Sequence, residues 1–419
     1  MPLSKITERM DNVTMRFIEG GVCAAKGFKA SGIHVGVKTN NKDKKDLALI
    51  VSDFDCTAAA VFTRNVVKAA PLLVTKENLR DGRARIVFAN SGNANACAPQ
   101  GENNARRMCN AIAKELALNE KDVLVASTGV IGQELPVEVI EKGVTKLTEE
   151  LSYDGSKDAA DAIMTTDLTK KEFAVEFVTG GKSIRIGGIA KGSGMIHPNM
   201  GTMLAFLTTD CAISSKMIKK ALTNATNISF NRVSVDGDTS TNDMLTLMAN
   251  GVAGNKEITE PDVDFDAFSE ALNALCIELA KEIAADGEGA THLITCKVNG
   301  AKSEEEAEAL SKSVISSTLT KAAVFGADAN WGRVLCAMGY SGIEFDPETV
   351  NIAFESNAGR ITVCDAGQGL KFDETTAKKI LTEHDVTIDI NLSAGVAGCT
   401  CWGCDITYDY IKINGDYRT

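Results

Sequence analysis

The order of extended and helical stretches is the feature that most limits the fold of this chain. Stretches with the two-residue period of a strand alternate with stretches that repeat every three to four residues, as a helix does. These stretches do not follow the regular strand–helix–strand rhythm of a doubly wound fold, so the sequence predicts α/β layers with mixed sheets. Strands are expected at 33–38, 47–52, 85–90, 123–127, 173–178, 183–189, 349–355, 360–364 and 385–392, and helices at 103–118, 136–151 and 265–283.

The length of 419 residues is enough for about two to four domains. Glycines cluster at 179–181, where they predict a hairpin turn, and again at 187–194. We take these two clusters as the best candidates for internal boundaries, and we expect a further break near 286–289.

Composition excludes several classes of function. The net charge is −12 and the pI is near 5.0, so the chain lacks the basic face that binds nucleic acid or an anionic membrane surface. The first thirty residues contain no apolar core of a secretion signal, and no run approaches the roughly 18 apolar residues of a membrane span. We therefore expect a cytoplasmic protein whose twelve cysteines are reduced thiols.

The most unusual segment is GGIAKGSGMIHPNMGTMLAFLTTD, at 187–210. It fits neither of the common glycine-rich phosphate loops, because Lys191 precedes its glycine and His197 stands where a dinucleotide loop needs its third glycine. The pair Gly201-Thr202 suits another chemistry, in which a hydroxyl attacks the preceding carbonyl and frees its own α-amine as a base. Such pairs are common, and a flexible loop is the alternative interpretation.

Two other patterns bear on this chemistry. The chain has only four histidines and no G-x-S-x-G motif, which favours a nucleophile that supplies its own base. Thr128 and Gly129 follow an apolar strand, where a hydroxyl and an N–H can stabilise one oxyanion. A simple turn after the strand is the alternative.

Metal sites are not expected. Asp236, Asp238 and Asp243 fail the calcium-loop pattern, because Thr241 and Leu247 replace its required glycine and glutamate. A polar loop is the better interpretation.

Three clustered cysteines lack a fourth zinc ligand, so we expect buried thiols around a tryptophan rather than zinc. These residues are Cys399, Cys401, Cys404 and Trp402.

Several motifs together resemble one family, the glutamate N-acetyltransferases (ornithine acetyltransferases) of arginine biosynthesis, known as the ArgJ family. Besides the segment around Thr202, the resemblance covers the whole chain in order. The matching motifs are FTRNVVKAAP (62–71), NSGNANAC (90–97), STGVIG (127–132), MTTD (164–167), NRVSVDGDTSTND (231–243), DGEGATH (286–292), NWGR (330–333), WGCDITYDY (402–410) and the terminal NGDYRT.

The resemblance implies a specific set of functional residues. Thr202 is the nucleophile, and the chain divides before it into an α chain, 1–201, and a β chain, 202–419. Thr128 and Gly129 form the oxyanion hole. The implied fold is of the N-terminal-nucleophile type, with a second, smaller α/β domain. The residues implied to contact substrate are Thr165, Lys191, Thr202, Glu288, Asn414 and Thr419.

The implied reaction moves an acetyl group from N-acetylornithine to glutamate through an acetyl-Thr enzyme, with no metal or organic cofactor. Acetyl-CoA is a candidate second donor, and an α2β2 assembly is the implied oligomer. The family commonly has alanine before the nucleophile, where this chain has Gly201. One alternative is a self-processing aminopeptidase of related fold, against which the terminal NGDYRT and the substrate residues argue. The other is a non-catalytic zinc or thiol module.

Overall fold

The larger of the two sheets is built mainly from long, apolar strands. The computed structural model describes residues 9–10, 13–39, 43–197 and 203–415. Ten strands form one sheet in the order β1-β2-β7-β8-β9-β11-β4-β5-β6, with β3 paired to β4. Their bounds are β1 Arg9–Met10, β2 Val13–Ile18, β3 Phe28–Ile33, β4 Leu47–Phe62, β5 Arg83–Asn93, β6 Val123–Val130, β7 Lys171–Thr179, β8 Lys182–Lys191, β9 Leu204–Thr209 and β11 Met244–Ala249.

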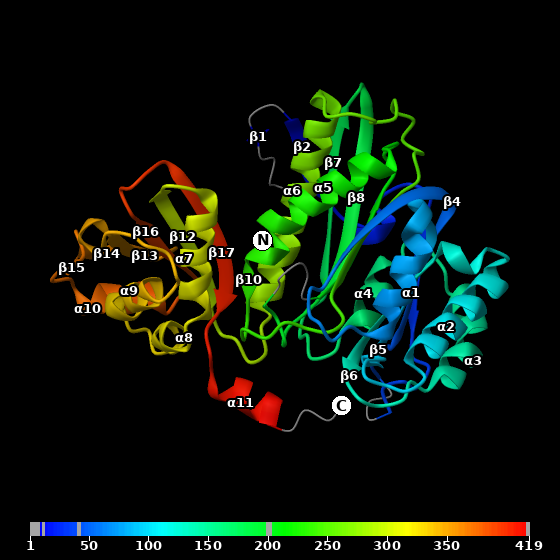
Figure 1. Cartoon of the computed structure of the whole chain (residues 1–419), viewed down its shortest axis with the longest axis horizontal. Coiled ribbons are helices and arrows are strands. Elements are labelled where there is room, and N and C mark those ends of the chain that lie inside the picture. Colours follow the sequence, from blue (N-terminus) through cyan, green and yellow to red (C-terminus); the bar gives the residue numbers. More distant parts are fainter. Residues whose placement is uncertain (1–8, 11–12, 40–42, 198–202, 416–419) are drawn as a thin grey trace.

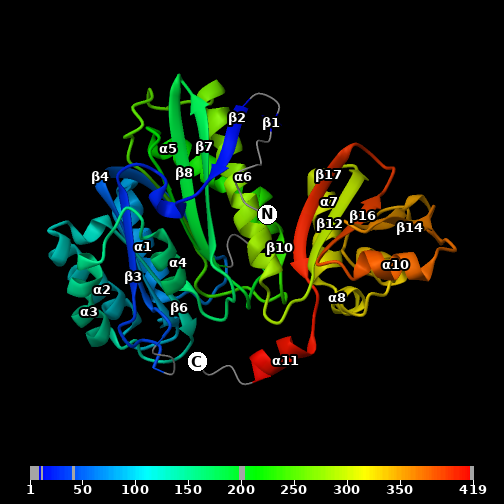
Figure 2. The same cartoon turned by 180° about the vertical axis from the view of Figure 1, so that it is seen from behind.

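Helices cover both faces of this sheet (Figures 1 and 2). On one face lie α5 and α6, whose apolar residues pack with β7, β8, β9 and β11 in the largest core cluster. Helix α4 packs on the other face, in a second cluster with apolar residues of β3, β4, β8 and β9. Helices α2 and α3 cover β4, β5 and β6 from the side opposite to α4 in a third cluster, because alternate residues of these strands belong to the two clusters, and α1 contributes to both. The helix bounds are α1 Ala70–Asn78, α2 Gly101–Leu116, α3 Val137–Glu149, α4 Ser156–Ile163, α5 Ser215–Ile228 and α6 Val263–Ala285.

A second, smaller sheet has its own core, and all of its strands except β10 follow α6. Its seven strands run β10-β17-β12-β16-β13-β14-β15, and it mixes parallel and antiparallel pairs. The bounds are β10 Val233–Ser234, β12 Leu293–Ala301, β13 Asn351–Ser356, β14 Gly359–Asp365, β15 Gln368–Gly369, β16 Asp385–Asn391 and β17 Ala397–Cys404, with helices α7 Glu304–Ser316, α8 Thr318–Phe325, α9 Trp331–Gly339, α10 Glu374–Leu381 and α11 Tyr408–Gly415.

Short 3-10 turns join several of these elements. They are η2 Gly21–Cys23, η3 Leu79–Asp81, η4 Glu120–Asp122, η5 Phe230–Arg232 and η6 Pro347–Thr349. The expected fold of mixed-sheet α/β layers with a second, smaller α/β domain is thus confirmed. The expected break near 286–289 lies between α6 and β12. Among the described residues, no helix is both long and apolar enough to cross a membrane.

Three expectations from the sequence are wrong. The strand predicted at 33–38 ends at Ile33, because the buried Asp46 carboxylate accepts the N–H groups of Val35, Gly36 and Lys38 at 2.7, 3.0 and 3.0 Å. Because these three N–H groups donate to a side chain, they are not available to hydrogen-bond a neighbouring strand.

The glycine-rich segment at 187–194 is not a boundary either. Its first five residues lie inside β8, in the middle of the large sheet. A Cβ on Gly187 would lie 1.7 Å from the carbonyl oxygen of Gly21, so glycine is required there for close backbone packing. The 179–181 cluster is the turn of the β7–β8 hairpin, which confirms the predicted hairpin. It is therefore not a domain boundary.

Candidate active site

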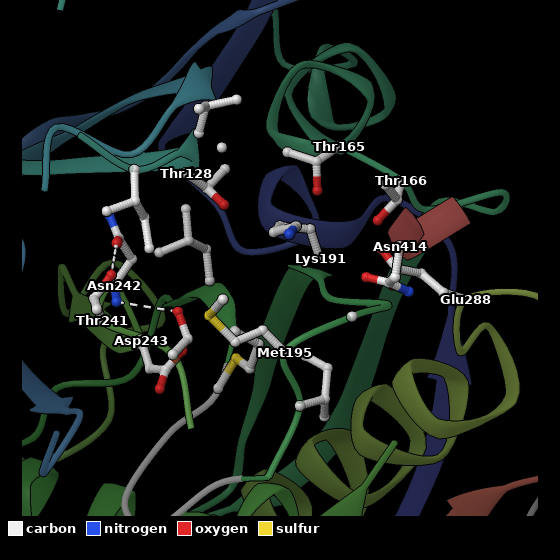
Figure 3. Close-up of a pocket in the computed structure, with 18 residues that line it drawn as sticks. Thr128, Thr165, Thr166, Lys191, Met195, Thr241, Asn242, Asp243, Glu288 and Asn414 are labelled. Carbon is white, nitrogen blue, oxygen red and sulfur yellow. Dashed lines mark hydrogen bonds between the residues drawn. The ribbon is translucent and has the colours of Figure 1, made fainter. Parts of the chain in front are cut away.

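One cavity of about 330 Å³ collects most of the residues that the sequence singles out. It lies where the ends of β6, β8 and β9 meet the loop before β11, and α11 reaches it from the second sheet. Figure 3 shows its polar side chains from these separate elements pointing into a common space. The predicted site residues that line it are Thr128, Gly129, Thr165, Lys191, Glu288 and Asn414. Gly201, Thr202 and Thr419 lie outside the described residues.

The end of β6 is held rigidly against β5. Gly129 has φ +132°, and a Cβ there would lie 2.3 Å from the carbonyl carbon of Gly92. Thr128 is 9% exposed, and among the described residues its hydroxyl has no hydrogen-bond partner. Thr128 thus retains a donor for a bound group, on a strand whose backbone cannot shift.

A buried network of amide side chains supports this strand end from behind. Asn242 donates to the carbonyl oxygens of Ser127 and Ala94 at 2.8 and 2.7 Å, which ties the loop before β11 to β6 and β5. The Ser127 hydroxyl donates to Asn90 at 2.6 Å, and Asn90 donates to the carbonyl of Asn93. Each of these polar groups is satisfied, so the network fixes the geometry at Thr128.

Lys191 supplies positive charge at the end of β8. It is 7% exposed, and its Nζ lies 3.9 Å from Oδ2 of Asp167. Asp167 is fully buried and also pairs with Lys171 at 2.8 Å, and Lys171 in turn pairs with Asp286 at 2.6 Å. Burial alone would raise the pKa of Asp167, but the two lysines lower it well below its usual range. Asp167 is therefore an anion that fixes Lys191 beside the cavity.

The cavity lining also includes the carboxyl group of Glu288. Glu288 is 6% exposed, and its Oε2 accepts a hydrogen bond from Nδ2 of Asn414 at 2.7 Å. The Glu288 N–H donates to the carbonyl of Ser193 at 2.9 Å, so the residue that follows α6 is tied to the segment that follows β8. A lysine and a glutamate in the lining of one cavity suit a ligand that carries both charges, as an amino acid does.

The chain on both sides of 198–202 is anchored. The carboxylate of Asp236 accepts the N–H groups of Met195 and Ile196 at 2.6 and 2.9 Å. On the other side, the N–H of Met244 donates to the carbonyl of Met203 at 2.9 Å, and β9 continues in parallel register with β11. Both flanks of the Gly201-Thr202 pair therefore have fixed positions at the cavity.

Several cavity residues were not anticipated. Thr166 and Met195 line the cavity, as do Asn242 and Asp243 before β11. In the sequence, Asp243 stood out only as a calcium ligand whose loop pattern failed. Its place directly before an apolar strand was the available signal. Among the described residues, no group of three or more His, Cys, Asp or Glu could hold a metal ion. Cys399, Cys401 and Cys404 are buried free thiols, as expected.

Comparison with known proteins decides the family. The family model described as the ArgJ family matches residues 29–419. The chain belongs to the ArgJ family. Its relatives include the arginine biosynthesis bifunctional protein ArgJ of Symbiobacterium thermophilum, 48% identical over 406 residues, which are 97% of this chain and 100% of that protein. The bifunctional protein ArgJ 1 of Clostridium acetobutylicum is 49% identical over 393 residues, covering 94% of this chain and 96% of its own.

A solved structure of a relative is also similar. The ornithine acetyltransferase of Mycobacterium tuberculosis, in complex with ornithine, is 39% identical and covers 45% of this chain and 100% of its own, with a TM-score of 0.40. Membership of the ArgJ family confirms the family identified from the motifs, and with it an acetyltransferase of arginine biosynthesis.

Proposed function

We propose that this enzyme transfers the acetyl group of N2-acetyl-L-ornithine to L-glutamate through an acetyl-Thr202 intermediate, after the chain cuts itself between Gly201 and Thr202. One observation carries the proposal: a single cavity joins the Thr128–Gly129 strand end, Lys191 and Glu288 to Met203, which is bonded to Thr202. The family membership of the chain supports the same reaction.

The first half of the reaction forms the acetyl-enzyme. The Thr202 hydroxyl attacks the acetyl carbonyl of N-acetylornithine, and the α-amine freed by the cut accepts its proton. The Thr128 hydroxyl and the Gly129 N–H stabilise the oxyanion of the tetrahedral intermediate. The amide C–N bond then breaks, and ornithine leaves with the proton from the α-ammonium.

The second half reverses these steps with glutamate. Its amine attacks the acetyl ester, N-acetylglutamate leaves, and the Thr202 hydroxyl is restored. Lys191 pairs with a substrate carboxylate and Glu288 with a substrate ammonium, because both residues line the cavity and their charges are complementary to those of an amino acid. Thr165 and Asn414 provide polar contacts, and Thr419 stays a predicted contact outside the described residues. No cofactor takes part in this cycle.

The acceptor distinguishes this reaction from that of a hydrolase. Purified enzyme is incubated with N-acetylornithine and glutamate, and the products are separated by mass spectrometry. We expect N-acetylglutamate and ornithine in equal amounts. Release of acetate without N-acetylglutamate would contradict the proposal and favour an aminopeptidase-like hydrolase. A parallel arm with acetyl-CoA and glutamate tests the second donor.

A pair of lysine variants on one strand tests the charge assignment. Lys191→Met is expected to raise KM for N-acetylornithine by about ten- to a hundredfold, because a charge-assisted hydrogen bond of about 1.5–3 kcal/mol is lost. Lys182→Met, at the exposed opposite end of β8, is the control and should leave KM unchanged. Equal KM values for Lys191→Met and the parent would contradict the role of Lys191 in substrate binding.

The cytoplasmic location and the α2β2 assembly stay predictions.

A further inference from the structure

Asp243 is a buried carboxyl group in the wall of the cavity that the proposed transfer cycle does not use. It is 1% exposed and lies in the loop directly before β11. Among the described residues, its Oδ2 is buried without a hydrogen-bond partner. Such an orphaned carboxylate oxygen is costly, and it therefore points to a role in function.

The position of Asp243 relative to the backbone shows what it can act on. Met244, the residue after Asp243, donates its N–H to the carbonyl of Met203 at 2.9 Å and pairs with Leu204. Asp243 and Met203 both line the cavity. Asp243 therefore lies beside the residue that is bonded to the proposed nucleophile.

The self-cleavage step needs a group of this kind. In the transfer cycle the α-amine of Thr202 is the base, but before the cut that nitrogen is an amide and cannot accept a proton. The step therefore needs a separate proton acceptor, and among the described residues no histidine lines the cavity. Asp243 and Glu288 are its two carboxyl residues, and Glu288 already binds Asn414.

We propose that Asp243 is the proton-transfer group of self-cleavage. Its carboxylate takes the proton of the Thr202 hydroxyl as Oγ1 bonds to the carbonyl carbon of Gly201. The Gly201–Thr202 C–N bond then breaks, and the Asp243 carboxyl returns the proton to the leaving nitrogen, which becomes the free α-amine. Water hydrolyses the resulting ester, which restores the hydroxyl and leaves a carboxylate on Gly201. This inference rests on the self-cleavage in the proposed function.

The electrostatic setting of Asp243 agrees with this role. Burial raises its pKa well above the usual range, and the Ser240 and Thr63 hydroxyls, the Lys191 ammonium and the Met203 N–H lower it only in part. Lys191 is the charged side chain that acts on it from a packed element, β8, since the other three groups are neutral. A carboxylate of raised pKa is a stronger base near neutral pH than an ordinary aspartate.

The test follows self-cleavage of the full chain during cell-free synthesis, with the uncut and cut products quantified by mass spectrometry over time. Asp243→Asn should slow the cut by about 10²- to 10⁴-fold at pH 7, and Asp243→Glu should restore part of the rate. Asp210→Asn is the matched control, because Asp210 is a fully buried carboxyl at the other end of β9. It should leave the cut unchanged.

The pH profile separates proton transfer from a structural role. The parent rate should rise tenfold per pH unit up to the pKa of Asp243 and then level off, and Asp243→Asn should lose this titration. A melting temperature of Asp243→Asn at or above that of the parent would show that the slow variant is folded. Cleavage of Asp243→Asn at the parent rate, or a lower melting temperature without rescue by Asp243→Glu, would overturn the inference. A parent chain that is never cut would instead overturn the proposed function.

Discussion

At the scale of single residues, the site depends on backbone geometry that a sequence pattern shows only indirectly. The motif at Thr128 and Gly129 was visible in the sequence, but the reason for its glycine was not. Gly129 is required because its strand lies directly on Gly92, a contact between segments far apart in the chain. The buried network through Asn242 likewise depends on contacts across more than a hundred residues.

Gly129→Ala tests this packing. We expect it to destabilise the protein by about 2–4 kcal/mol, since the added methyl meets backbone and φ +132° is strained for alanine. Gly132→Ala is the control, because φ there is +79° and a Cβ would meet nothing within 4 Å. It should cost only about 1–2 kcal/mol of backbone strain. Urea denaturation measures both, and equal losses would show that the contact with Gly92 is unimportant.

At the scale of elements, periodicity predicted most strands and helices, and local polar contacts explain the errors. The helix expected at 265–283 is the buried α6, and Ser303 caps α7 by accepting the Glu306 N–H. The strand expected at 33–38 failed because Asp46 binds its backbone. The alternation of apolar residues does not show that the side chain of a later residue, Asp46, accepts the backbone N–H groups of this segment.

The ion pairs of Lys171 join three elements and give a prediction on stability. Lys171 on β7 is fully buried between Asp167, after α4, and Asp286, after α6. Lys171→Met should cost about 3–5 kcal/mol because two buried carboxylates lose their cation. Lys170→Met, which breaks a partly exposed pair with Asp161, should cost less than about 1 kcal/mol.

The loss of stability in Lys171→Met depends on pH with a definite sign. The folded-state pKa of Asp167 is lowered, so its contribution is present above the pKa of an unfolded aspartate, about 3.9, and is lost as the pH falls toward its folded-state pKa. Urea melts should therefore show the full deficit of Lys171→Met at pH 7 and a smaller one below about pH 4. A deficit that does not change with pH would contradict the ion-pair account.

At the scale of the whole molecule, the order of strands could not be predicted from the sequence. The segments before and after the proposed cut meet in the middle of one sheet, because β8 pairs with β9 and β4 pairs with β11. Glycines that look like a flexible boundary in the sequence therefore lie inside the core layer. Among the described residues that follow the second sheet, Asn414 of α11 lines the cavity and donates to Glu288.

This arrangement predicts that the two chains stay together after the cut. The α and β chains share a continuous sheet, so separating them requires unfolding of its core. We expect one species on native size exclusion. When the 44.4 kDa of the whole chain is divided in proportion to length, a denaturing gel should show bands of ~21 and ~23 kDa. Chains that separate without denaturant would contradict the shared sheet.

The central claim, that Thr202 becomes an N-terminal nucleophile, is tested most directly by intact-mass spectrometry of enzyme incubated with N-acetylornithine alone. We predict a chain that begins at Thr202 and carries one acetyl group, which glutamate removes, while Thr202→Ala stays uncut and unmodified. An uncut parent chain that still makes N-acetylglutamate, or an acetyl group on any other residue, would contradict the account.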